Sequence, residues 1–181
     1  IAFGCETIIK GILDAGHTII VRPHRVSEVD DAKKLEELNQ LFGESENFFW
    51  AKDLCSEEPY FGAHVLITDW SGAAFSFGFG LNRPVLFIDL PKKINNSEFE
   101  KFENVPIEIL LRSKMGKNLA VEELDQAPKH LNDLYSQTQE WSIKLSALRE
   151  RWCYRPGNAS EFAANYISTL LDDIQNNKLS R

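Results

Sequence analysis

Five consecutive residues, Thr68, Asp69, Trp70, Ser71 and Gly72, combine chemical groups that suit a phosphate. They separate an apolar run of β-forming residues from a run of small residues, which places them between a predicted strand and a predicted helix. A helix start offers free N–H groups and the positive end of its dipole to an anion. A serine hydroxyl adds a donor, and glycine lets a ligand approach the backbone. The alternative is that Asp69 or Ser71 only caps the helix.

Another group with three ionisable basic side chains, Arg22, His24 and Arg25, follows a different predicted strand in this acidic chain. Arginine suits bidentate phosphate binding, and histidine can donate a proton or act as acid or base near neutral pH. Ligands of open parallel sheets bind at the carboxyl ends of the strands, so this group is expected at the same edge as Asp69 and Gly72. The alternative is a solvated loop with a helix-capping histidine.

Two more segments carry polar groups at predicted element ends. Asp89 and Lys92 come just after a further strand, and they are candidate nucleotide or substrate contacts together with Arg25. Asn158, Ala159 and Ser160 precede the last predicted helix, with a glutamate three residues after the asparagine. That spacing resembles a capping box, so a plain helix start is the alternative to a second anion site. Together the segments predict a pocket for a phosphorylated, nucleotide-linked ligand.

The elements that must position these groups form a strand–helix–strand rhythm. Apolar runs predict strands at residues 17–22, 47–50, 64–68, 85–88 and 107–111, and small residues predict a helix at 73–81. This rhythm is typical of a parallel sheet with right-handed crossovers. The predicted fold class is therefore α/β, a Rossmann-like parallel sheet flanked by helices.

The carboxyl-terminal part of the chain is predicted to be helical. Between residues 131 and 152 apolar residues recur at spacings of three and four, which predicts one long helix. Residues 155–157 should break it before a last helix begins. We interpret residues 128–176 as carboxyl-terminal helices of a single domain that spans residues 1–181. The stripe on the long helix is expected to pack on this domain rather than on a partner.

Composition narrows the functional classes. The chain has 181 residues, with 20 Lys and Arg against 27 Asp and Glu, and a net charge of −7. An acidic protein is a poor non-specific ligand for nucleic acid, which needs a basic face. Three widely spaced cysteines predict neither a disulfide framework nor a zinc site, and no apolar run approaches the ~20 residues of a membrane span. Because the chain begins with isoleucine, we interpret it as a piece of a longer protein.

The motifs resemble those of a known family. The segment 64–72, His-Val-Leu-Ile-Thr-Asp-Trp-Ser-Gly, followed by Pro-Val-Leu-Phe-Ile-Asp at 84–89, resembles the signature of CDP-glycerol glycerophosphotransferases. These are the teichoic-acid primases and polymerases of the bacterial cell envelope. Arg-Pro-His at 22–24 resembles the family's R-P-H-P, and Gly-Asn-Ala-Ser at 157–160 resembles its late G-x-A-S. The order and spacing fit from about residue 7 to 171.

The resemblance implies the carboxyl-terminal half of a GT-B fold, which binds the donor CDP-glycerol or a related CDP-alditol. A hydroxyl of a surface polymer, or of its lipid-linked primer, would attack the β-phosphate, and CMP would leave. The amino-terminal half would complete the cleft, so this chain is expected to be inactive alone. The resemblance implies no metal and no cofactor. It also implies a cytoplasmic protein with peripheral contact to the inner face of the membrane.

Residue roles follow from the matching positions. The resemblance implies that Ser71 and the backbone at Gly72 hold the pyrophosphate in the segment that begins at Thr68 and Asp69. His24 would be the catalytic residue that contacts or protonates the phosphate, and Arg22 would add charge. The segment Asn158–Ser160 would complete the phosphate cradle.

Two other readings of the sequence remain open. One is a different GT-B enzyme, such as a nucleotide-sugar glycosyltransferase or a UDP-N-acetylglucosamine 2-epimerase. The other is a non-catalytic nucleotide-binding or interaction module with the 131–152 stripe as its contact face. Preference for cytidine over uridine ligands separates the transferase from the first alternative.

Overall fold

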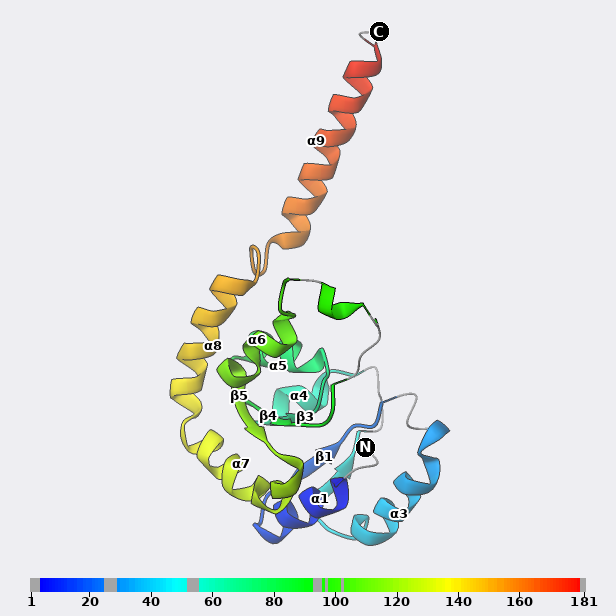
Figure 1. Cartoon of the computed structure of the whole chain (residues 1–181), viewed down its shortest axis with the longest axis vertical. Helices are drawn as coiled ribbons and strands as arrows, with labels where there is room; N and C mark the ends of the chain where they lie inside the picture. The colour runs from blue at the N-terminus through cyan, green and yellow to red at the C-terminus, as the bar shows by residue number, and fades with distance from the viewer. Residues whose placement is uncertain are drawn as a thin grey trace. The chain divides into compact units, whose positions relative to one another are not determined.

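The computed structural model describes residues 4–24, 29–51, 56–92, 96, 98–101 and 103–179 (Figure 1). The chain divides into two compact units, Ile1–Leu145 and Ser146–Arg181. The first unit is α/β, with parallel strands flanked by helices. This confirms the predicted fold class at that level.

A two-stranded parallel sheet begins the first unit. β1 (Ile19–Val21) pairs with β2 (Phe48–Trp50), as the two apolar runs predicted. Helices α1 (Cys5–Asp14) and α3 (Ala32–Phe42) contribute Ile9 and Leu38 to a buried cluster with Phe48. Alternation along a strand sends neighbouring side chains to opposite faces, so the next residue, Phe49, remains about half exposed.

A second sheet of three parallel strands lies in the same unit, in the order β3 (Leu66–Thr68), β4 (Val85–Ile88) and β5 (Gly116–Leu119). All four residues of β4 are buried, which is typical of a central strand covered on both faces. Helix α5 (Ala73–Leu81) connects β3 to β4, and the predicted helix 73–81 is confirmed. Among the described residues the hydrogen-bonded strands fall into two parallel sheets, which is compatible with the predicted Rossmann-like arrangement.

The connection from β4 to β5 corrects one prediction. Residues 107–111, predicted as a strand, begin helix α6 (Ile107–Met115). Leu111, Arg112 and Met115 are its buried residues, and their spacing of one, three and four fits one face of a helix. The strand that follows, β5, has the sequence Gly-Lys-Asn-Leu, which carries little apolar signal.

Further helical segments of the first unit precede helix α8. They are α4 (Glu58–Gly62), the 3₁₀ turns η1 (Phe99–Lys101) and η2 (Val121–Gln126), and α7 (Ala127–Ser136). Helix α8 (Thr138–Trp152) then begins separately, so the predicted single long helix is interrupted at Gln137. The hydroxyl groups of Ser136 and Thr138 donate to backbone carbonyls three residues earlier, which favours a break in a helix at this point.

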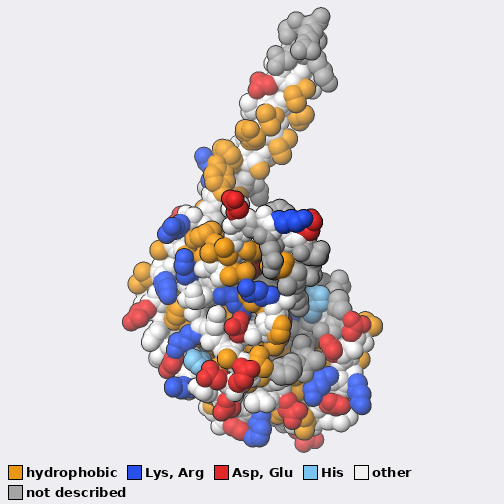
Figure 2. Space-filling model, viewed as in Figure 1, with side chains coloured by type: hydrophobic (Ala, Val, Ile, Leu, Met, Phe, Trp, Pro, Cys, Tyr) orange, Lys and Arg blue, Asp and Glu red, His pale blue; other side chains and the backbone are white. Residues whose placement is uncertain are grey.

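The second unit contains the end of α8 and helix α9 (Ala159–Leu179), separated by the predicted break. Arg155 and Gly157 both have positive φ in this turn, at 48° and 87°. Figure 2 shows apolar side chains along α9, and several of them are about half exposed: Tyr166, Ile167, Leu170, Leu171 and Ile174. No helix in the described ranges is both long enough and apolar enough to cross a bilayer.

Candidate functional site

The three strands of the larger sheet end at one edge, and a hollow of about 800 Å³ lies there. Asp69 and Trp70, directly after β3, line it together with residues 89–92, after β4. Residues 120–122, directly after β5, complete the lining. Parallel strands bring their carboxyl ends to the same side of a sheet, so three chain segments meet here. The predicted candidates Asp69, Asp89 and Lys92 therefore border one hollow.

The loop from Thr68 to Gly72 leads from β3 into the first turn of α5. The Ser71 Oγ accepts a hydrogen bond from the Ala73 N–H at 3.2 Å. This bond satisfies one donor of the first helical turn, so Ser71 does support the helix start. The bond uses the hydroxyl oxygen as acceptor and leaves the hydroxyl hydrogen to donate to a ligand.

Gly72 stands in open space at the start of α5. A Cβ built on it would meet no atom within 4 Å, and its φ of −61° is ordinary for any residue. The glycine is therefore not needed for backbone conformation or for packing. Its absent side chain leaves the backbone at the amino end of the helix open to an approaching anion.

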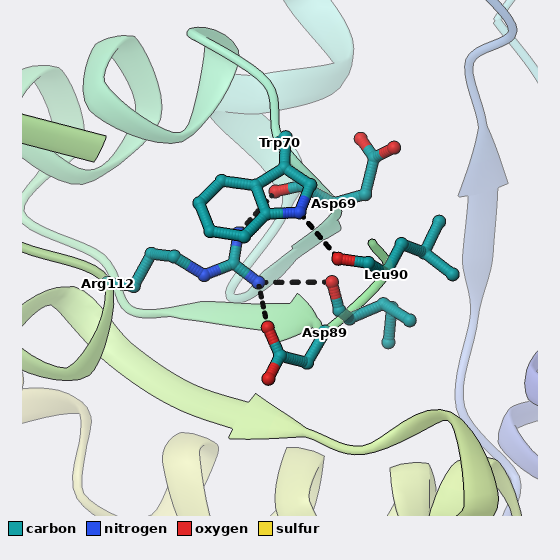
Figure 3. A network of polar contacts seen from close by, with 6 residues as sticks. Asp69, Trp70, Asp89, Leu90 and Arg112 are labelled. Carbon is teal, nitrogen blue, oxygen red and sulfur yellow. Dashed lines mark hydrogen bonds and ion pairs between the residues drawn. The ribbon is translucent and has the colours of Figure 1, made fainter. Parts of the chain in front are cut away.

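One buried arginine, Arg112 of α6, ties the loops after β3 and β4 together (Figure 3). Its Nη1 donates to the Asp69 carbonyl at 3.0 Å, and its Nη2 donates to the Ile88 carbonyl at 3.1 Å. Nη2 also lies 3.5 Å from the Asp89 carboxylate, with which it forms an ion pair. Only 5% of Arg112 is exposed.

The flat faces of the same guanidinium contact aromatic rings. The Arg112 Cζ lies 3.9 Å from the centre of the Trp70 ring and 4.7 Å from that of Phe87. The Trp70 indole N–H donates to the Leu90 carbonyl at 2.7 Å (Figure 3). Trp70, which lines the hollow, is thus fixed both by stacking and by a hydrogen bond.

Burial and nearby carboxylates act on this arginine in opposite directions. Burial lowers the pKa of Arg112, and the negative charges of Asp89 and Asp69 raise it in part. The pKa of a guanidinium is so high that the group keeps its charge in a protein. A permanent cation therefore lies behind the loop, while Lys92 brings a second positive charge to the rim.

Arg22 is not among the residues that line this hollow. Its guanidinium lies 4.9 Å from the centre of the Tyr60 ring in α4, and it lines a different, mainly apolar cavity of about 650 Å³. In the described part of the chain β1 pairs with β2 alone, and residues of β1 and β3 line this second cavity together. His24 is exposed after β1, and Arg25 lies outside the described residues.

The last group of predicted site residues lies in the second unit. Asn158 precedes α9, whose first two residues are Ala159 and Ser160. The Phe162 N–H donates to the Asn158 carbonyl at 3.1 Å. The Arg155 guanidinium lies 4.0 Å from the centre of the Phe162 ring, at the start of the same helix.

Sequence reasoning did not identify Arg112, and it did not identify Val121 or Glu122, which also line the hollow. Arg112 bonds to carbonyls 24 and 43 positions away in the chain, and no local spacing predicts such contacts. Within the described ranges, no group of three or more His, Cys, Asp and Glu side chains is arranged to hold a metal ion.

No protein-family model matches the chain, and no curated protein or solved structure was found to match it. The relationship to glycerophosphotransferases therefore stays a prediction from the motifs.

Proposed function

We propose that this chain is the nucleotide-donor-binding part of a transferase, which moves glycerol phosphate or a related alditol phosphate from a CDP-linked donor to a hydroxyl. The observation that carries the proposal is the open helix start at Ser71 and Gly72, beside a hollow built from the loops after β3, β4 and β5. Such an edge combines donors for a pyrophosphate with room for the rest of a nucleotide.

In this proposal the donor pyrophosphate lies at the start of α5. The Ser71 hydroxyl and the backbone N–H groups of Ser71 and Gly72 donate to its oxygens. The hydroxyl of the acceptor attacks the β-phosphate, the bond from that phosphorus to the bridging oxygen breaks, and CMP leaves. Positioning and charge stabilisation supply most of the catalysis in phosphoryl chemistry of this kind.

The nucleoside part of the donor is assigned to the neighbouring hollow. Trp70 offers an aromatic surface there, Asp89 can accept from ribose hydroxyl groups, and Lys92 adds a positive charge near the phosphates. The roles that the motifs assign to Arg22 and His24 at the transferred phosphate stay predictions. The acceptor and the remainder of the cleft are assigned to a separate half of the enzyme.

Calorimetric titration of the chain with CDP-glycerol, CMP, UDP-N-acetylglucosamine and UDP tests this function. We expect the two cytidine ligands to bind and the uridine ligands to bind at least about tenfold more weakly, a difference that a single well-placed hydrogen bond supplies. A preference for uridine would instead favour a nucleotide-sugar glycosyltransferase or an epimerase. A folded chain that binds none of the four would contradict the proposed donor site.

Two variants locate the site. Ser71→Ala removes the hydroxyl donor and should weaken CDP-glycerol binding by about tenfold. Ser76→Ala is the matched control, because Ser76 is exposed on the same helix. His24→Ala tests the motif-based role of the exposed histidine. Thermal unfolding of each variant separates an effect on binding from an effect on folding.

A further inference from the structure

We propose that Arg112 is the positioning residue of this site, which holds the loops after β3 and β4 in their binding shape without itself contacting the ligand. The nature of the ligand rests on the proposed function, but the positioning role does not. It concerns the shape of the loops in the protein alone.

Burial keeps the Arg112 guanidinium from direct contact with a ligand, and its Nε–H, which has no hydrogen-bond partner among the described residues, is itself buried. One terminal nitrogen donates to the Asp69 carbonyl, and the other donates to the Ile88 carbonyl and pairs with Asp89. Aromatic rings contact its faces, and only 5% of the residue is exposed to solvent. A group arranged in this way acts through the residues that it holds.

The contacts of Arg112 lie just beyond the paired part of β3 and β4. Backbone pairing between β3 and β4 ends where Thr68 lies opposite Phe87. Asp69, Ile88 and Asp89, which Arg112 bonds, are the residues just beyond that last pair. The side chain therefore continues the link between the two chain segments at the point where the sheet no longer supplies it (Figure 3).

An arginine suits this buried position better than a lysine or an apolar residue if its role is to hold the loops. Burying a charge costs free energy that only good geometry and several hydrogen bonds can offset. A planar guanidinium can bond two carbonyls in different directions and stack on two rings at once, whereas a lysine ammonium cannot. The strands pair without Arg112, so a buried apolar side chain would serve the sheet at least as well. The arrangement is explained by the loops that it fixes.

The test compares Arg112→Lys with Leu111→Ala. Leu111 is the fully buried neighbour on α6, so its truncation destabilises the fold while the Arg112 side chain itself is kept. We expect Arg112→Lys to accelerate amide hydrogen exchange in residues 69–72 and 89–92 and to weaken CDP-glycerol binding about tenfold or more, because small misplacements of a site are costly. Leu111→Ala should lower the melting temperature but leave the affinity of the folded protein unchanged.

Wild-type exchange in both segments of Arg112→Lys would overturn the positioning role. Faster exchange with unchanged affinity would overturn its relevance to binding. If the wild-type chain binds no nucleotide, the proposed function fails, and the exchange data still decide whether Arg112 orders the loops. If Arg112→Lys does not fold, Phe87→Leu removes one stacked ring from the guanidinium and should loosen the same two segments.

Discussion

Replacing Gly72 by alanine adds one methyl group, which is expected to affect ligand binding and not folding. A Cβ at this position meets no atom within 4 Å, and the backbone angles are helical. Gly72→Ala should therefore keep the fold, or stabilise it by about 0.4–1 kcal/mol through the unfolded chain. The methyl group would occupy space that the proposed pyrophosphate needs, so we expect weaker CDP-glycerol binding by calorimetry.

Gly80→Ala is the control for this prediction. Gly80 is exposed on the same helix, and a Cβ there also meets nothing within 4 Å. Both variants should unfold at or slightly above the wild-type temperature, and only Gly72→Ala should bind less tightly. Equal affinities in the two variants would argue against an anion at the start of α5.

A second residue-scale prediction concerns acid stability. The Lys117 ammonium of β5 lies 2.8 Å from the Asp133 carboxylate of α7. The hydrogen bond and the charge of Lys117 hold the pKa of Asp133 below its ordinary value. A carboxylate with a lowered pKa in the folded state stabilises the protein above its unfolded pKa, about 3.9, and this contribution is lost as the pH falls through the folded pKa.

In Asp133→Asn the free energy of unfolding should therefore fall less steeply as the pH is lowered into the acid range. Urea unfolding followed from neutral pH down to about pH 2 measures this change. Asp125→Asn is a suitable control, because Asp125 is exposed and forms no ion pair among the described residues. The same steepness of the acid limb in Asp133→Asn and the wild type would show that the pair contributes nothing to acid stability.

At the scale of elements, the close pairing of β4 with β5 depends on one glycine. Gly116 lies opposite Val85, and a Cβ on Gly116 would come within 1.7 Å of the Val85 carbonyl oxygen. The obstructing atoms are backbone, so the strands would have to separate. We expect Gly116→Ala to lower the free energy of unfolding by roughly 3 kcal/mol or more. Asn118→Ala, exposed in the same strand, should have a much smaller effect in the same urea titration.

The elements that the sequence predicted well are those whose signal is local. The strands at 64–68 and 85–88 and the helix at 73–81 each have an apolar run of the right length between turn residues, and each is confirmed in its core. The strand predicted at residues 107–111 was wrong, because five apolar or charged residues in a row fit either a strand or a helix. The buried Met115 four residues beyond Leu111 decides for the helix.

In the candidate site, too, the residues with a local signal in the sequence were predicted and the others were not. Asp69, Asp89 and Lys92 each follow a strand, and the structure brings them to one hollow. The contact of Arg22 with the Tyr60 ring was not predictable, because long-range packing decides it and no local pattern indicates it. Arg112 had no signal at all, because its partners are backbone carbonyls that every sequence possesses.

At the scale of the whole molecule, the buried core belongs to one unit. Every buried apolar residue of the described chain lies between Ile8 and Leu145. We therefore expect a chain ending at Trp152, which keeps α8 entire, to unfold cooperatively near the temperature of the full chain. Calorimetric melting of both proteins tests this. Loss of the cooperative transition in the shortened chain would show that the 29 residues after Trp152 are needed for the first unit to fold.

The position of Arg112 in the sequence also sets an order of events during synthesis. The carbonyl of Asp69 precedes the arginine that holds it by 43 residues. A growing chain can pair β3 with β4 before α6 has left the ribosome, but at that stage its loops lack the arginine and keep the hydrogen bond from Trp70 to the Leu90 carbonyl. The loops after β3 and β4 should therefore reach their final arrangement only on a nascent chain that has already docked α6.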